Sequence, residues 1–342
     1  MGRVAAFVLA LLVAVGLTYR VMSESWMLVE EPVRVEKYLE GTAEKPFATR
    51  VLVPGATKLV VLLIPESSRP MLGRLVSPFV PDLVEREDVY DPAPYAVIGL
   101  IMVLSIVAYS IVTERSYNHF FGNSRTHWWV PLATLLLLIP FVLRPVGHIY
   151  DFTSLLLQAA MLYALFVGRI RSYFLLFIIA CFTKETAILM SAAFAGVYFD
   201  RMPRRRWVLL LVAQLAMFCL IYGVLAYHFR HNGGEAVYVW ISDHLSFYFG
   251  STRRFLKYAV FYIAGLILVG FRWSQKPLTL RRAAWMWIPH AGLILQASFP
   301  GEIRNFYESA PLMTLFALRN SESLVVTRFA RIRGAAKMGG GV

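Results

Sequence analysis

Residues Tyr173–Tyr198 read YFLLFIIACFTKETAILMSAAFAGVY, and this stretch decides how the chain is expected to fold. It is apolar throughout except at its centre, where Thr183-Lys184-Glu185-Thr186 interrupts the run. A helix of ~20 apolar residues crosses a bilayer. The stretch is therefore either one membrane span with two charges at its middle, or a hairpin of two short helices.

Arginine placement separates the two alternatives. Arginines 169 and 171 precede the stretch, and arginines 201, 204, 205 and 206 follow it. Because Lys and Arg concentrate in cytoplasmic loops, a single span would place one of these clusters on the wrong side. We therefore predict a hairpin of Tyr173–Phe182 and Ala187–Tyr198, with its Lys-Glu tip inside the protein near the outer interface.

Composition agrees with a membrane protein. Hydrophobic residues make up 58% of the chain and charged residues only 16%, whereas soluble domains carry about 25% charged residues. The net charge of +13 has no soluble basic domain that would bind nucleic acid, and clustered Lys and Arg in a membrane protein usually encode orientation. We expect no nucleic-acid partner.

The remaining apolar runs complete the predicted topology of about ten membrane segments. They are Val4–Tyr19, Tyr95–Val112, Trp128–Val142, Phe152–Val167, Trp207–Tyr227, Phe255–Phe271, Ala283–Phe299 and the shorter Pro311–Leu318. With both termini in the cytoplasm, 18 of the 34 Lys and Arg lie on the cytoplasmic side. The short outer loops and the hairpin tip hold 7, and the other 9 lie between Arg20 and Arg86. This bias favours the stated orientation.

The predicted fold is thus all-α, a polytopic transmembrane helix bundle in the inner membrane of a bacterium. Residues 1–20 form the first transmembrane helix, a signal anchor, although Ala14-Val15-Gly16 also fits a signal-peptide cleavage site. Residues 21–94 form a long extracytoplasmic loop in which Val51–Pro65 lies as an interfacial helix. Residues 95–320 complete the bundle, and 321–342 form a basic cytoplasmic tail.

Several separate outer turns bring ionisable residues to one end of this predicted bundle. Such groups at membrane depth are expensive and usually face a cavity or one another. Because adjacent residues on a helix point in different directions, Lys184 and Glu185 each need another partner, for instance Asp151 for Lys184 and Arg304 for Glu185. The full set comprises Arg50, Arg144, His148, Tyr150, Asp151, Lys184, Glu185, Glu302, Arg304 and Asn305. A purely structural interpretation, in which these pairs only fasten helix ends, stands beside the functional one.

The layout resembles bacterial polytopic glycosyltransferases of the GT-C superfamily. The shared elements are a first span, a long acidic outer loop, Pro46–Pro54 (PFATRVLVP), Tyr150-Asp151, Lys184-Glu185-Thr186 and the turn Glu302–Pro311. They cover most of the chain in architecture, but each motif is short. The sequence departs from the superfamily in lacking an Asp-Asp or Glu-Asp pair directly after the first span.

The resemblance implies an activity on the outer face: transfer of a sugar from a polyprenyl-phosphate donor to an envelope glycan or lipid acceptor. In that superfamily an acid on the first outer loop serves as base or metal ligand, and basic groups bind the donor phosphate. Carried over, the predicted catalytic residues are Glu30, Glu31 and Asp151, and the predicted substrate-binding residues are Arg50, His148, Lys184, Glu185, Glu302 and Arg304.

Two other functions remain open from the sequence. One is a polymerase or ligase of O-antigen or exopolysaccharide, which would use the same face and lipid. The other is a non-catalytic transporter or scaffold. The chain has no His/Cys cluster with zinc spacing and no phosphate-binding glycine loop. We assign no metal ligand, although a divalent cation (Mg²⁺ or Mn²⁺) bridging carboxylate and phosphate is compatible with the chemistry.

Overall fold

The computed structural model describes residues 2–23, 34–80, 91–122, 127–142, 147–235, 239–302 and 306–321. These residues form helices and turns, and no strand occurs among them. The longer helices are α1 (Gly2–Ser23), α7 (Pro92–Phe121), α10 (Asp151–Phe166), α11 (Ile170–Cys181), α12 (Leu189–Tyr198), α13 (Arg204–His228), α15 (Thr252–Gly270), α17 (Trp287–Ala297) and one over 310–321.

Shorter helices connect and cover the long ones. The α-helices are α3 (Val35–Glu40), α4 (Leu52–Val61), α5 (Arg69–Val76), α8 (Val130–Leu136), α9 (Ile139–Val142), α14 (Ile241–Phe249) and α16 (Leu278–Ala283). The 3₁₀ turns are η2 (Phe47–Thr49), η3 (Glu66–Ser68), η4 (Ser77–Phe79), η5 (His127–Trp129), η6 (Glu185–Ile188), η7 (Trp273–Gln275) and η8 (Ala284–Met286).

Among the described residues, four helical segments are long and apolar enough to cross a membrane, by length and composition: Val4–Ser23, Pro92–Phe121, Arg204–His228 and Thr252–Gln275. In the third and fourth only 11% of the most apolar window is buried inside the protein. Leu220 and Leu266, for example, expose about 70% of their surface. Apolar surface uncovered on this scale marks a face that meets lipid or another protein. The chain is therefore a helical bundle with the character of a membrane protein.

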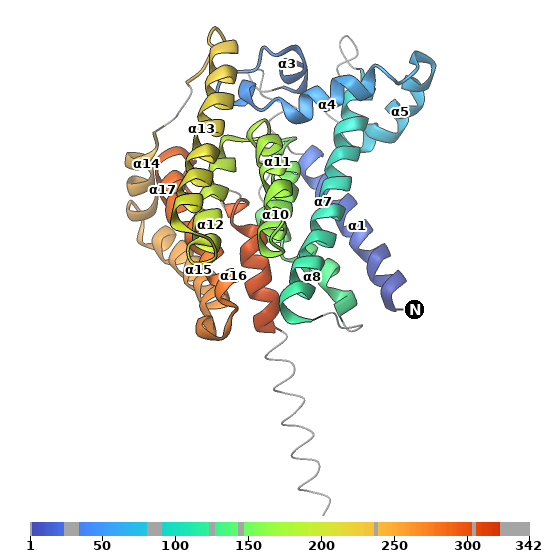
Figure 1. Cartoon of the computed structure of the whole chain (residues 1–342). Coiled ribbons are helices and arrows are strands. Elements are labelled where there is room, and N and C mark those ends of the chain that lie inside the picture. The colour runs from blue at the N-terminus through green and yellow to red at the C-terminus, as the bar shows by residue number, and fades with distance from the viewer. Residues whose placement is uncertain are drawn as a thin grey trace, which may run out of the picture.

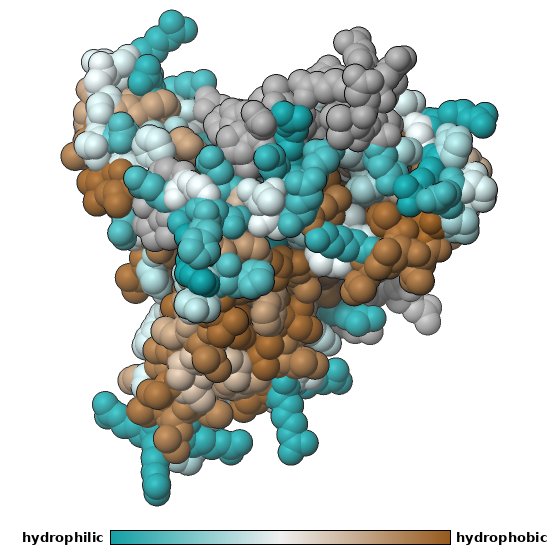
Figure 2. Space-filling view, turned by 90° about the horizontal axis from the view of Figure 1, so that it is seen from above, coloured by the Kyte–Doolittle hydropathy of each residue, from teal (hydrophilic) through white to brown (hydrophobic). Residues whose placement is uncertain are grey.

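Figure 1 shows the bundle in three parts. Helices α1, α7 and α8 lie on one side, and α13, α14, α15 and α17 lie on the other. Helices α10 and α11 and the helix over 310–321 stand between them. Helices α3, α4 and α5 lie together across one end, and the N-terminus of α1 lies at the opposite end. Figure 2 looks down onto the end that carries α3–α5. Hydrophilic residues gather in the centre of this view, and hydrophobic residues form a large patch in its lower half and smaller ones at its left and right.

Local sequence explains where the long helix α7 begins. Asp91 precedes α7, its carboxylate accepts a hydrogen bond from the amide of Ala93 at 3.0 Å, and Pro92 occupies the first turn. An acidic N-cap followed by proline is a strong start signal, because the capped amide has no partner inside the helix. The predicted span from Tyr95 to Val112 is correspondingly longer in the structure.

Two predicted spans are broken in the structure. The run Trp128–Val142 divides into η5, α8 and α9, with a turn at 137–138. Pro140 has no amide hydrogen to donate to residue 136, so a helix cannot continue smoothly through it. The run Ala283–Phe299 divides into the end of α16, η8 and α17. Periodicity alone did not reveal either break.

The interrupted stretch folds back on itself. Helix α11 ends at Cys181 and η6 begins at Glu185. The hydroxyl of Tyr173 donates a hydrogen bond to the carbonyl of Met190 at 2.8 Å, and its ring stacks on Phe194. In a continuous helix residues 173 and 190 would lie about 25 Å apart. The chain therefore reverses at 182–184, as the predicted hairpin requires.

Candidate functional site

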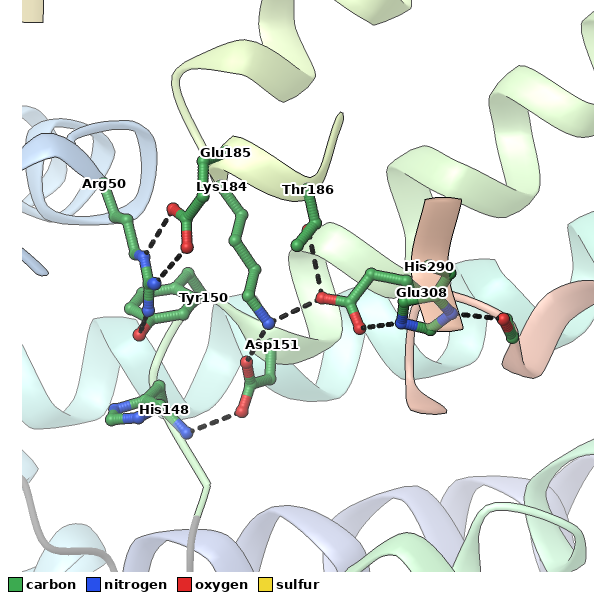
Figure 3. Close-up of polar contacts among 10 residues, drawn as sticks. Arg50, His148, Tyr150, Asp151, Lys184, Glu185, Thr186, His290 and Glu308 are labelled. Carbon is green, nitrogen blue, oxygen red and sulfur yellow. Dashed lines mark hydrogen bonds and ion pairs between the residues drawn. The ribbon is translucent and has the colours of Figure 1, made fainter. Parts of the chain in front are cut away.

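The turn between α11 and α12 sends two neighbouring charged side chains in different directions. The amides of Thr183 and Lys184 both donate to the carbonyl of Ala180, which closes α11. Lys184 then adopts an extended backbone (φ −163°, ψ 142°). Successive side chains of extended backbone point to opposite sides. In Figure 3, accordingly, Glu185 points toward Arg50 while Lys184 points toward Asp151 and Glu308.

Arg50 and Glu185 form a two-fold ion pair. Arg50 Nε donates to Glu185 Oε2 at 3.1 Å, and Nη2 donates to Oε1 at 2.5 Å. Arg50 Nη1 donates to the hydroxyl of Tyr150, and its guanidinium lies 4.7 Å from the centre of that ring. Parallel N–H···O bonds between guanidinium and carboxylate are among the strongest that side chains make. Burial raises the pKa of Glu185, but the charge of Arg50 outweighs burial, so the net pKa is lowered.

The loop that carries Arg50 is fastened to the bundle on two sides. The amide of Leu52 donates to the carbonyl of Phe182 at 2.9 Å, which joins the start of α4 to the tip of the hairpin. The side-chain amide of Asn232, beyond α13, donates to the carbonyls of Gly41 at 2.9 Å and Ala43 at 2.8 Å. These contacts hold Arg50 over the tip although it lies 135 residues from Glu185.

Lys184 lies between two buried carboxylates. Its Nζ is 2.6 Å from Glu308 Oε1 and 3.8 Å from Asp151 Oδ1. The other oxygen of Asp151 accepts the backbone amide of His148 at 2.9 Å. The Asp151 and Glu308 side chains are 4% and 3% exposed, and that of Lys184 is 17% exposed. The lysine is therefore the most accessible member of this group.

The network continues from Glu308 to His290. His290 Nε2 lies 3.6 Å from Glu308 Oε2, and His290 Nδ1 shares a hydrogen bond of 2.5 Å with the hydroxyl of Ser309. The hydroxyl of Thr186 donates to Glu308 Oε1 at 3.0 Å. Burial raises the pKa of Glu308, but Lys184 and His290 outweigh burial, so its pKa lies well below the ordinary value.

Figure 3 shows these side chains following one another in a row from Arg50 to His290. We call the six charged or titratable members Arg50, Glu185, Lys184, Asp151, Glu308 and His290 the charge network. Three carboxylates face the two permanent cations Arg50 and Lys184, and His290 lies beside Glu308. A buried carboxylate that loses its cation strongly destabilises the fold.

The structure brings together four of the predicted site residues: Arg50, Asp151, Lys184 and Glu185. The predicted contact of Lys184 with Asp151 is present. Glu185 pairs with Arg50, and Arg304, the partner predicted for it, lies outside the described residues. His148 lies at the edge, where its ring stacks on Tyr150 with centroids 5.1 Å apart.

Five of the predicted residues lie outside the described part of the chain: Glu30, Glu31, Arg144, Arg304 and Asn305. Glu302 follows Gly301, whose backbone hydrogen-bonds to the hydroxyls of Tyr248 in α14 and Tyr258 in α15. The contacts that define the charge network are made by other residues.

Sequence reasoning missed Glu308 and His290. Both carry a signal of the kind that drew attention to Lys184, because His290 lies inside the apolar run 283–299 and Glu308 directly precedes the last one. An ionisable residue in an apolar run usually has a buried partner. Applied evenly, that criterion would have selected both.

Within the described part of the chain, no group of three or more His, Cys, Asp or Glu side chains is arranged to hold a metal ion. No protein-family model, no curated protein and no solved structure matches this chain. The class defined so far is a helical bundle with four candidate membrane spans and a buried charge network. Any more specific function rests on the chemistry of that network.

Proposed function

We propose that this protein is a membrane glycosyltransferase similar to the GT-C superfamily, which transfers a sugar from a polyprenyl-phosphate donor to an envelope glycan or lipid acceptor. The observation that supports it most is the meeting of Arg50, Lys184 and Asp151 in one network, from three segments distant in sequence. The network lies beneath the loop region of α3 and α4, in a chain with otherwise few charges.

The proposal includes a topology. About ten membrane segments, some of them short, cross or enter the inner membrane of a bacterium with both termini in the cytoplasm. The end of the bundle that carries α3–α5 then faces outward, and the hairpin tip lies below it. The distribution of Lys and Arg along the chain supports this orientation.

The proposed reaction needs two kinds of group. The acceptor hydroxyl attacks the anomeric carbon of the donor, the bond from that carbon to the phosphate oxygen breaks, and the hydroxyl proton passes to a carboxylate. A positioned carboxylate within hydrogen-bond reach supplies the base. Lys184 and Arg50 would stabilise the charge that develops on the departing phosphate. Asp151, Glu30 and Glu31 are the candidates for the base.

Transfer by the purified, reconstituted full-length protein tests the proposal. With a radiolabelled polyprenyl-phosphate sugar and an envelope glycan extract, wild type should label the acceptor. Lys184→Gln should lose at least about a hundredfold in rate, the usual cost of removing one such stabilising group. Lys58→Gln, an exposed lysine on α4, is the matched control. Wild-type transfer by Lys184→Gln would exclude the proposed role.

The same experiment separates the two glycan-related activities. A transferase adds a residue and changes the composition of the acceptor. A polymerase or ligase changes the length of the glycan while its composition stays constant. Gel mobility and sugar analysis of the labelled product therefore decide between them.

A non-catalytic scaffold is the second candidate, because both permanent cations already have carboxylate partners. The double variant Lys184→Met with Glu308→Met removes one matched pair and leaves an apolar contact, which buried ion pairs often tolerate. If the network is only structural, this variant should fold and keep its cellular function. The enzyme proposal expects a folded protein without transferase activity.

A further inference from the structure

An open groove is lined by residues of η7, α16, η8 and α17. Helix α16 lies in the half of the bundle away from α3–α5 (Figure 1). The volume of the groove is about 650 Å³, which is in the range of ligand sites. The walls are mostly apolar: Trp285 and Ile288 are 41% and 77% exposed, and Leu278 is 52% exposed. A hydrocarbon chain lying in the groove would cover these side chains.

Two N–H groups in the groove wall have no acceptor among the described residues: Nε of Arg281 and Nε1 of Trp287. Both atoms are buried, and an unpaired buried donor is unfavourable. The indole of Trp287 is fixed against Trp273 and Phe316, so its N–H cannot simply turn away to water. An oxygen acceptor that reached these two atoms would satisfy both donors.

The other cations nearby already have partners. The guanidinium of Arg282 pairs with Asp200. Lys276 donates from Nζ to the carbonyls of Val269 at 2.8 Å and Phe271 at 2.5 Å. No acidic side chain of the described chain pairs with Arg281. The groove thus combines apolar walls with the guanidinium of Arg281, which has no acidic partner among the described residues.

We propose that this groove binds an anionic phospholipid of the surrounding bilayer, its phosphate on Arg281 and Trp287 and an acyl chain along Trp285, Ile288 and Leu278. A phospholipid supplies both features at once, whereas a free phosphate or nucleotide would leave the apolar wall uncovered. Basic pockets between helices at a membrane surface bind anionic headgroups in this way. The inference depends neither on the proposed transferase activity nor on the orientation of the bundle.

Native mass spectrometry of the detergent-purified full-length protein tests it. Wild type should retain phosphatidylglycerol in preference to phosphatidylcholine. Arg281→Gln should weaken phosphatidylglycerol binding about fivefold, the effect of one basic residue at a charged surface. Trp287→Phe, which removes the N–H and keeps an aromatic ring, should weaken it by a smaller factor.

Arg205→Gln is the matched control, because Arg205 is an exposed arginine at the start of α13. Equal losses in Arg281→Gln and Arg205→Gln would mean unspecific attraction and would overturn the proposal. So would equal retention of the two lipids by wild type, or displacement of the lipid by millimolar inorganic phosphate. If Arg281→Gln does not fold, the Trp287→Phe variant and the lipid comparison on wild type decide.

Discussion

At the scale of single residues, Lys184 holds the charge network together. Its ammonium is the shared partner of Glu308 and Asp151, and its extended backbone directs Glu185 toward Arg50. Each carboxylate left without a cation would lose the interaction that offsets its burial. The contribution of Lys184 is therefore asymmetric: the matched network adds little net stability, but an unmatched one costs much.

Substitution of Lys184 by Met should lower the free energy of unfolding by about 3 to 5 kcal/mol, because Asp151 and Glu308 then remain buried without their cation. Thermal unfolding in detergent, followed by circular dichroism, measures the loss. Lys58→Met, at an exposed position on α4, should unfold like wild type. Adding Glu308→Met to Lys184→Met should recover part of the lost stability. Equal midpoints for Lys184→Met and wild type would contradict the prediction.

Acid should weaken the charge network over a defined range of pH. The pKa values of Glu308 and Glu185 are lowered in the folded protein. The folded state therefore binds their protons less readily than the unfolded chain does. Their stabilising contribution is complete above the ordinary glutamate value of about 4.3, and it is lost as pH falls below that value toward the lowered pKa.

The thermal midpoints of wild type and Glu308→Gln, compared between pH 7 and pH 3, test this pH range. The difference between the two proteins should be largest at pH 7 and should shrink as the solution becomes acidic. Glu66→Gln, an exposed glutamate before α5, should track wild type at every pH. A difference that stays constant with pH would show that the Glu308 carboxylate charge does not stabilise the fold.

At the scale of helices, α12 approaches α16 and η8 closely at Gly196. A Cβ at position 196 would overlap the carbonyl oxygen of Arg282 and come 2.9 Å from Cγ of Trp285. Small residues permit such close backbone approach between membrane helices. This contact fixes α12, the arm of the hairpin that follows the charged tip, against the C-terminal part of the bundle.

Gly196→Ala should destabilise the protein by about 1 to 3 kcal/mol, because the added methyl forces α12 away from α16. Gly223→Ala is the matched control, since nothing lies within 4 Å of a Cβ at that position of α13. Alanine favours an open helix site over glycine by about 0.5 to 1 kcal/mol, so the control should be neutral or slightly stabilising. Unfolding in detergent compares the pair. Similar midpoints for the two variants would refute the close packing at Gly196.

At the scale of the whole molecule, the proposed orientation places the loop after α13 outside the cell and the start of α13 inside. His231 and Arg205 are exposed residues in these two places. In a background with Cys181 and Cys219 replaced by Ala, His231→Cys should react with a membrane-impermeant maleimide on intact cells. Arg205→Cys should react only after permeabilisation. The reverse pattern would invert the proposed topology and place the charge network near the cytoplasmic side.

Local patterns anticipated much of this architecture. The apolar runs predicted the helices, and the interruption at Thr183–Thr186 predicted the reversal between α11 and α12. The breaks in two predicted spans, at 137–138 before Pro140 and in η8, were missed. Hydrophobicity does not report where backbone hydrogen bonding fails. Asp151 was predicted as a partner of Lys184 from the cost of burying a charge.

The sequence by itself determined that the chain is helical, that it is apolar enough for a membrane, and that a few positions in or beside its apolar runs are charged. Those properties follow from residue type and short spacing. Only the tertiary structure decided which charges meet. Arg50 pairs with Glu185, and Glu308 and His290 complete the network, although the segments that carry them lie 100 or more residues from the tip. Contacts over such separations depend on how helices pack, and packing depends on the summed fit of many side chains.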